Sequence, residues 1–135
     1  MSTNIYISNL DKNRIRKIIE DMYLDGRIPD KTVKKLEDEL ERAITVNPQK
    51  MPHDIVTMNS RVLLHLDDED IEVSLTYPDE ADLSSMKLSV FSPIGTAILG
   101  YREGCTVEWD VPSGKATIDI KKILYQPEAS GDYHL

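Results

Sequence analysis

The spacing of hydrophobic residues in this chain changes near residue 50, and this change constrains the fold more than any other feature. Between residues 10 and 44 apolar residues recur at steps of three and four, as in helices that bury one face. From residue 55 onward apolar and polar residues alternate, as in half-buried strands. The stretch "NPQKMPHD" separates the two patterns, and Pro48 and Pro52 end the helical one. We therefore predict an α+β chain with a helical unit at 1–47, a linker at 48–53 and a sheet domain at 54–135.

The helical unit is predicted to be a short antiparallel hairpin that pairs as a coiled coil. Its first helix is expected at 9–24, with Asn9 or Asp11 as the N-cap. The stretch "DGRIPD" interrupts the pattern, and Asp30 is placed to cap a second helix at 31–46. Two amphipathic helices joined by a short loop favour an antiparallel pair. The predicted apolar stripes consist of Leu10, Ile15, Ile18, Ile19 and Met22, and of Val33, Leu36, Leu40, Ala43 and Ile44.

The second unit is predicted to be an antiparallel sheet with one short helix. The stretch "SPIGTAILG" supplies that helix, because Ser92 suits the N-cap, Pro93 the first helical position and Gly100 the stop. Its apolar residues would cover one face of the sheet. The last residues, "QPEASGDYHL", are expected to be disordered, with packing of Tyr133 and Leu135 against the sheet as the alternative. The predicted strands are 55–66, 71–77, 86–91, 106–111 and 115–125.

Charge and composition favour a soluble protein of the cytoplasm that binds a macromolecular partner. The net charge of −8 argues against sequence-independent DNA binding, because phosphates repel an acidic surface. Residues 1–50 have a net charge of +1 and residues 51–135 of −9, which indicates two units with different surfaces. The single cysteine suits a reducing compartment. The chain shows neither a signal peptide nor a stretch of about 18 apolar residues, so no membrane association is expected.

The residues that could carry catalysis or bind a metal ion have simpler explanations. Three scattered histidines and the lone Cys105 form neither a zinc site nor a nucleophile–base pair. The acidic run at 67–70 could bind a divalent ion, but a solvated hairpin turn explains it better. We therefore expect no enzymatic activity, no cofactor and no metal site. The histidines are His53, His65 and His134.

Two features of the helical hairpin leave alternatives open. The stretch "KNRIRK" forms either a solvated helix face or a basic flank for a hairpin that enters a channel containing nucleic acid. Asp25 and Asp30 at the tip could hold a catalytic metal ion, although a turn role and a cap role explain them more simply.

Three motifs carry a resemblance to a known family. "TYPDEAD", "LSVFSPIGTAILG" and "VPSGKATIDIKKILY" resemble, in order and spacing, the C-terminal domain of the bacterial Gre transcript-cleavage factors, over residues 53–125. "MPHDIVTMNSRV" and "YQPEASGDYHL" are similar to the regulators of nucleoside diphosphate kinase, a branch of the same superfamily. The resemblance implies an FKBP-like fold and binding to RNA polymerase.

The resemblance also implies which residues dock. In Gre-type proteins the serine–proline loop and its neighbour contact the rim helices of the polymerase β′ subunit, beside the secondary channel. Carried over, the docking residues are Ser92, Pro93 and Ile94, with Glu80 and Asp82 close by. The protein would act as a monomer, and effects on nucleoside diphosphate kinase would follow indirectly from transcription.

The hairpin departs from the cleavage factors, whose long coiled coil carries an Asp and a Glu three residues apart. An arm of roughly 15 residues spans about 22 Å, far less than a Gre arm. Asp25 and Asp30 are five residues apart, across a loop with Gly26 and Pro29. We therefore predict docking in competition with Gre factors, without transcript cleavage.

Two rival functions remain. The protein could assist transcript cleavage through Asp25 and Asp30 if these carboxylates reached the polymerase metal ion. It could also be an FKBP-like prolyl isomerase, but a proline pocket needs several aromatic side chains and the chain has one Trp, Trp109, and one Phe, Phe91.

Overall fold

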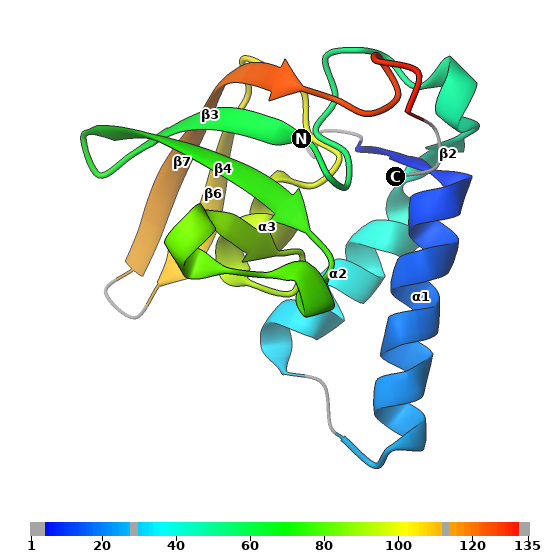
Figure 1. Cartoon of the computed structure of the whole chain (residues 1–135). Helices are drawn as coiled ribbons and strands as arrows, with labels where there is room; N and C mark the ends of the chain where they lie inside the picture. Colours follow the sequence, from blue (N-terminus) through cyan, green and yellow to red (C-terminus); the bar gives the residue numbers. More distant parts are fainter. Residues whose placement is uncertain (1–4, 28–29, 112–113, 133–135) are drawn as a thin grey trace.

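The computed structural model describes residues 5–27, 30–111 and 114–132, and it is an α+β protein as predicted (Figure 1). Among the described residues, no helix combines the length and the apolar character needed to span a bilayer. The helices are α1 (Asn9–Leu24), α2 (Lys31–Arg42) and α3 (Pro93–Ile98), with short 3₁₀ turns η1 (Pro48–Lys50), η2 (Pro78–Glu80) and η3 (Leu83–Ser85). The strands are β1 (Tyr6–Ser8), β2 (Ile44–Val46), β3 (Arg61–Leu66), β4 (Glu69–Thr76), β5 (Lys87–Ser89), β6 (Thr106–Val111) and β7 (Gly114–Tyr125).

The N-cap of α1 is Ser8, so the prediction of Asn9 or Asp11 was wrong. The Ser8 hydroxyl accepts a hydrogen bond from the backbone N–H of Asp11 at 3.0 Å. Asn9 instead donates its side-chain amide to Asn47 at 2.9 Å. The second cap is confirmed, because an Asp30 carboxylate oxygen accepts from the N–H of Val33 at 3.0 Å.

The second helix ends at Arg42, four residues before the predicted end. Residues 44–46 instead form β2, which pairs in parallel with β1, Tyr6 opposite Ile44. The N–H of Ile44 donates to the carbonyl of Ile5 at 2.8 Å. The run Ile-Thr-Val is rich in β-branched residues, which fit a strand better than a helix. Pairing with the N-terminal strand β1 therefore determines the conformation of residues 44–46, although their apolar spacing suits a helix.

The main sheet has the order β5-β4-β3-β7-β6. It was predicted to be antiparallel, but one of its pairs is parallel. Most neighbours pair antiparallel, but β5 runs parallel to β4, with Leu88 opposite Leu75. The chain reverses twice between these strands, through η2 and η3, and this crossover produces the parallel pair. The predicted strand at 55–66 begins only at Arg61, because residues before it form turns. The FKBP-like description and the coiled-coil pairing stay predictions.

The acidic run between β3 and β4 is a tight, exposed turn, as predicted. Asp67 and Asp68 both have positive φ, +52° and +63°, which matches the two-residue turn that suits a twisted hairpin. Asp70, just beyond the turn, pairs with His65 at 2.7 Å and with Lys121 at 3.8 Å. These two contacts engage Asp70, and the rest of the run, at 67–69, is exposed to solvent.

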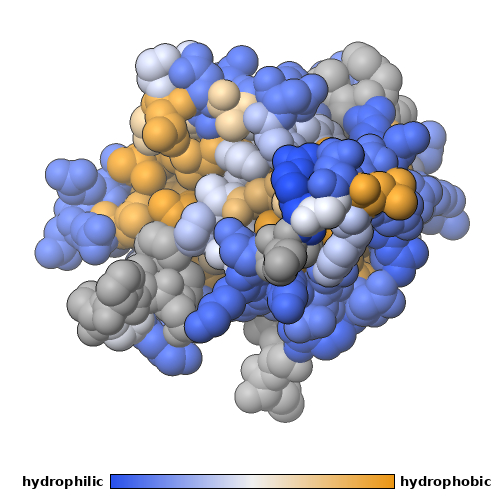
Figure 2. Space-filling view, turned by 90° about the horizontal axis from the view of Figure 1, so that it is seen from below, coloured by the Kyte–Doolittle hydropathy of each residue, from blue (hydrophilic) through white to orange (hydrophobic). Residues whose placement is uncertain are grey.

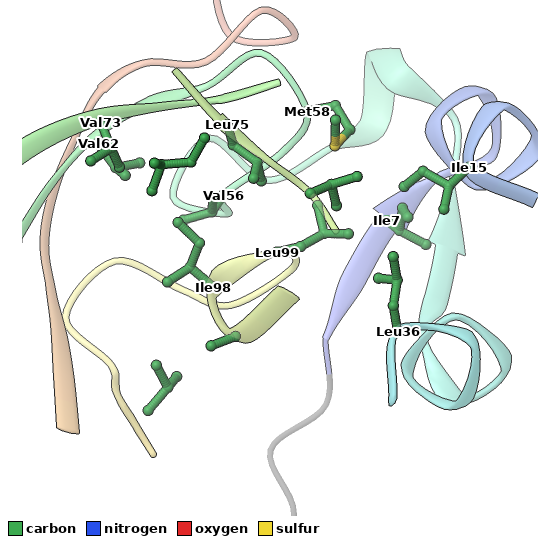
Figure 3. Packing of buried hydrophobic residues seen from close by; sticks show 14 of the residues in the cluster. Ile7, Ile15, Leu36, Val56, Met58, Val62, Val73, Leu75, Ile98 and Leu99 are labelled. Atoms are coloured by element: carbon green, nitrogen blue, oxygen red, sulfur yellow. The ribbon is translucent and has the colours of Figure 1, made fainter. Parts of the chain in front are cut away.

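A continuous hydrophobic core joins the hairpin to the sheet. Figure 3 shows Ile7, Ile15 and Leu36 from the helical side on one side of the cluster and sheet residues on the other, with Leu99 between them. All of these side chains are buried. The division into units at 1–47, 48–53 and 54–135 stays a prediction.

A buried carboxylate marks the junction between α1 and the sheet. Asp11 is 1% exposed, and its two oxygens accept from the N–H of Met58 at 3.3 Å and from the hydroxyl of Tyr77 at 3.2 Å. Burial, with the nearby charge of Glu128, raises the pKa of Asp11 to about 7, against these hydrogen bonds and the charge of Arg14. The hairpin is therefore tied to the segment that leads into β3 and to the segment that precedes η2.

Residues 126–132, the described part of the segment after β7, are ordered, which corrects the expectation of disorder for this part. Gln126 is 2% exposed and donates its amide to the carbonyls of Pro52 and Ile55, at 2.8 and 2.7 Å. Glu128 is also buried and accepts from the Thr57 hydroxyl at 2.7 Å. Tyr133 and Leu135 lie outside the described residues. Buried polar contacts to the linker, which no local pattern predicts, fix this segment.

We predict that Asp11→Asn changes the pH dependence of stability. The folded protein holds the Asp11 proton more tightly than the unfolded chain, so this stabilising contribution is complete below about pH 4 and is lost as the pH rises through about 7. Between those values the wild type should lose up to about 1.4 kcal/mol per pH unit relative to the Asn variant. Urea unfolding of both proteins at several pH values measures this difference. The exposed Asp21→Asn, on the same helix, is the control, and parallel curves for Asp11→Asn and wild type would contradict the prediction.

We also predict that Gln126→Ala lowers the free energy of unfolding by roughly 2–4 kcal/mol, because it leaves buried polar groups of the linker and of Ala129 without partners. Chemical denaturation measures the loss. The exposed Gln49→Ala should leave stability unchanged, and an equal effect of both substitutions would refute the role of Gln126.

Candidate protein-docking surface

The serine–proline loop between β5 and α3 is fixed by its own hydrogen bonds. Ser92 is the N-cap of α3: its hydroxyl accepts from the N–H of Gly95 at 3.1 Å and donates to the carbonyl of Ser89 at 2.7 Å. The Ser89 hydroxyl in turn accepts from the N–H of Phe91 at 3.0 Å. The Thr96 hydroxyl donates to the carbonyl of Val90 at 2.7 Å. The loop is therefore rigid before any partner binds.

Close approach of two backbone segments requires the glycine in this helix. A Cβ atom at Gly95 would lie 2.2 Å from the carbonyl oxygen of Ser89 and 3.1 Å from a methyl group of Leu75. Such a distance to backbone is prohibitive. Gly95 thus allows the start of α3 to lie against the end of β5.

Two of the predicted docking residues project from this loop. Pro93 is exposed at the first position of α3, and Ile94 is half-buried against the core. Ala97, Ile98 and Leu99 are buried, so the rest of the helix anchors the loop. The sequence prediction placed the helix correctly, with Ser92 as its cap; α3 ends at Ile98 and Gly100 follows with φ +84°.

The other two predicted docking residues have different local roles. Glu80 is exposed at the end of η2. Asp82 is exposed too, but its carboxylate accepts from the hydroxyls of Ser84 and Ser85, at 2.6 and 3.0 Å, and from the N–H of Ser84 at 3.0 Å. These hydrogen bonds, led by that of the Ser84 side chain, hold the pKa of Asp82 below its usual value. Asp82 therefore shapes the turn in addition to any contact with a partner.

Glu80 also borders a groove of about 490 Å³ between α1 and η2. Tyr77, Pro78 and Ile18 provide apolar lining. The guanidinium of Arg14 lies 6.0 Å from the centre of the Tyr77 ring, over its face. Sequence reasoning did not bring these residues together, because the groove joins two segments that are far apart in the sequence, within α1 and at residues 77–80, and neither segment carries a motif for it.

The two acidic residues at the hairpin tip are both engaged locally. Asp25 caps the end of α1 and pairs with Arg27 at 3.2 Å. Asp30 is the N-cap of α2. Both side chains are exposed, and the structure does not place them in a common site.

The remaining candidates stay apart. Among the described residues, no three His, Cys, Asp or Glu side chains are arranged to hold a metal ion. Cys105 is half-buried, His53 is exposed, His65 pairs with Asp70, and His134 lies outside the described residues. Trp109 gives no further information on a proline pocket, since its side chain is not described.

The face seen from below, in Figure 2, is largely hydrophilic. Apolar atoms gather on the side of the main sheet, within a surround of polar and charged residues. A small apolar area inside a polar rim is the usual composition of a protein–protein contact.

Comparison with known proteins accounts for both parts of the chain. The family model "Transcription elongation factor, GreA/GreB, C-term" matches residues 51–125, and the model "Rnk N-terminus" matches residues 3–46. The chain is similar to "Regulator of nucleoside diphosphate kinase" of Escherichia coli K12, with 42% identity over 97% of this chain and 96% of that protein.

Similarity extends to the elongation factors themselves. Transcription elongation factor GreA of Sulfurovum is 38% identical over 70% of this chain and 59% of its own length. The solved structure of a transcription elongation factor GreA/GreB from Nitrosomonas europaea superposes with a TM-score of 0.73 at 34% identity, covering 90% of this chain and all of that one. The resemblance predicted from the motifs is confirmed: the chain belongs to the Rnk branch of the GreA/GreB family.

Proposed function

We propose that this protein is a transcription regulator that binds RNA polymerase near the secondary channel, competes there with Gre-type factors and does not stimulate transcript cleavage. It acts as a monomer in the cytoplasm, without a cofactor and without binding DNA directly. Its partner surface is the pair of rim helices of the β′ subunit.

The observation that carries this proposal is the exposed Pro93 on a loop that is already rigid. Hydrogen bonds of Ser89 and Ser92 and the close approach at Gly95 hold the loop in one conformation. A preorganised apolar anchor loses little entropy on binding, so it contributes affinity efficiently. Relatives of this chain that carry the matching domain are elongation factors, which act on transcription.

The hairpin supports docking without cleavage. The 16 residues of α1 span about 24 Å and the 12 residues of α2 about 18 Å. One carboxylate oxygen of Asp25 pairs with Arg27 and one of Asp30 caps α2, so a metal ion at the tip would compete with local contacts for both side chains. Reach and chemistry at the tip both favour occupancy of the channel over catalysis.

Occupancy of the secondary channel would also account for a regulatory effect on the kinase without catalysis by this protein. The similar Escherichia coli protein is named for nucleoside diphosphate kinase. In this proposal any effect on that kinase is indirect: a docked protein excludes other channel-binding factors and thereby alters transcription.

We predict that Pro93→Glu weakens binding to core RNA polymerase at least tenfold, a loss of about 1.4 kcal/mol or more. The substitution replaces an exposed apolar anchor by a charge, while an acidic residue in the first turn of a helix is compatible with folding. Titration of labelled protein with polymerase measures the affinity.

The matched control for this test is Pro48→Glu. Pro48 also occupies the first position of a short helix, η1, and is half-buried next to β2. The Pro48→Glu variant should bind core RNA polymerase with the affinity of the wild type. If Pro93→Glu retains full affinity and an unchanged melting temperature, the docking loop is placed wrongly.

A further inference from the structure

We infer that the turn at residues 82–86 is a second, preorganised contact for the polymerase, with Leu83 as its apolar anchor. The inference rests on the proposed function and extends its docking surface beyond the serine–proline loop. The partner site is an apolar depression bordered by Lys or Arg side chains.

Leu83 is 77% exposed although it lies in an ordered turn, η3. Met86, at the end of the same turn, is 40% exposed. Single exposed apolar residues are common on proteins and carry no argument alone. Here two exposed apolar residues lie in one short turn, so the contacts that fix this turn decide whether it can serve as a binding surface.

The turn is fixed from both ends. The Asp82 carboxylate accepts three hydrogen bonds from Ser84 and Ser85. The backbones of Asp82 and Lys87 exchange two hydrogen bonds of 2.9 Å across the base of the turn. The backbone that carries Leu83 is therefore held in one conformation, which lowers the backbone entropy lost when a partner covers the turn.

Backbone strain at Met86, the end of the turn, also supports a binding role for the turn. Met86 has φ +56° and ψ +35°, a left-handed conformation that non-glycine residues rarely adopt. Such strain persists where surrounding contacts enforce it, and it concentrates at functional sites. A flexible methionine at an exposed, strained position also suits an adaptable binding surface.

The position of the turn joins it to the docking loop. The three residues of β5, which span about 10 Å, connect the turn to the serine–proline loop. Because β5 is an edge strand, this side of the sheet is not covered by another strand of the sheet. The turn and the loop therefore lie at the two ends of one short edge strand, and in this inference a single partner contacts both.

The acidic residues near the turn indicate which charge the partner site on the polymerase carries around its apolar depression. Asp79 and Glu80, shortly before the turn, are exposed, and they line the groove together with Arg14 and Lys17 of α1. The second half of the chain carries a net charge of −9. An acidic rim around an apolar anchor is complementary to a depression with a basic border and speeds association with it.

The test measures binding of the full chain to core RNA polymerase, with association and dissociation followed separately. Leu83→Ser should weaken binding at least fivefold, mainly through faster dissociation. Leu124→Ser, which alters a leucine that is 37% exposed on β7, should not change affinity. Asp79→Asn should slow association and reduce its dependence on salt.

Met86→Gly separates binding from folding. Glycine adopts the left-handed conformation readily, so the turn should persist with an unchanged or higher melting temperature while affinity falls severalfold. If the wild type binds polymerase and both Leu83→Ser and Met86→Gly bind with the same affinity, this inference is overturned while the docking proposal stands. Failure of the wild type to bind polymerase would overturn the docking proposal, and the inference with it.

Discussion

The buried carboxylate of Asp11 is the contact on which the arrangement of this molecule depends. It receives hydrogen bonds from Met58, in the segment that leads from the linker into β3, and from Tyr77, the residue directly before η2. Removing a carboxylate from water costs free energy, which these hydrogen bonds only partly offset, so the contact survives because the surrounding core is closed. As a result the hairpin, the linker and the entry to the docking surface hold one relative position (Figure 1).

The ordered C-terminal segment reinforces that position from the other side. Gln126 donates to the carbonyls of Pro52, in the linker, and of Ile55, just after it, and Glu128 accepts from the hydroxyl of Thr57. A hairpin held this firmly is suited to occupying a site next to the docking loop. At its tip, Asp25 pairs with Arg27, and Asp30 caps α2.

Sequence alone predicted the parts of the fold that depend on local chemistry. The cap of α2 by Asp30, the exposed acidic turn and the short helix that begins after Ser92 all follow from spacing and side-chain type. The misses share another cause. Ile44 entered a strand because residues 6–8 supply a partner, β5 became parallel because the chain crosses over through η2 and η3, and the tail is ordered through buried contacts to residues far along the chain. The candidate docking residues could be named from motifs, but neither the groove beside Glu80 nor the rigid turn at Leu83 has a local signal.

Displacement of a labelled Gre factor from core RNA polymerase by the purified protein, with transcript cleavage followed in the same reaction, tests the central claim most directly. The proposed function predicts that the protein displaces the factor in a saturable manner and that cleavage falls as the factor leaves. Retention of the Gre factor at saturating protein, or cleavage that is stimulated by the protein itself, would contradict a channel-occupying regulator.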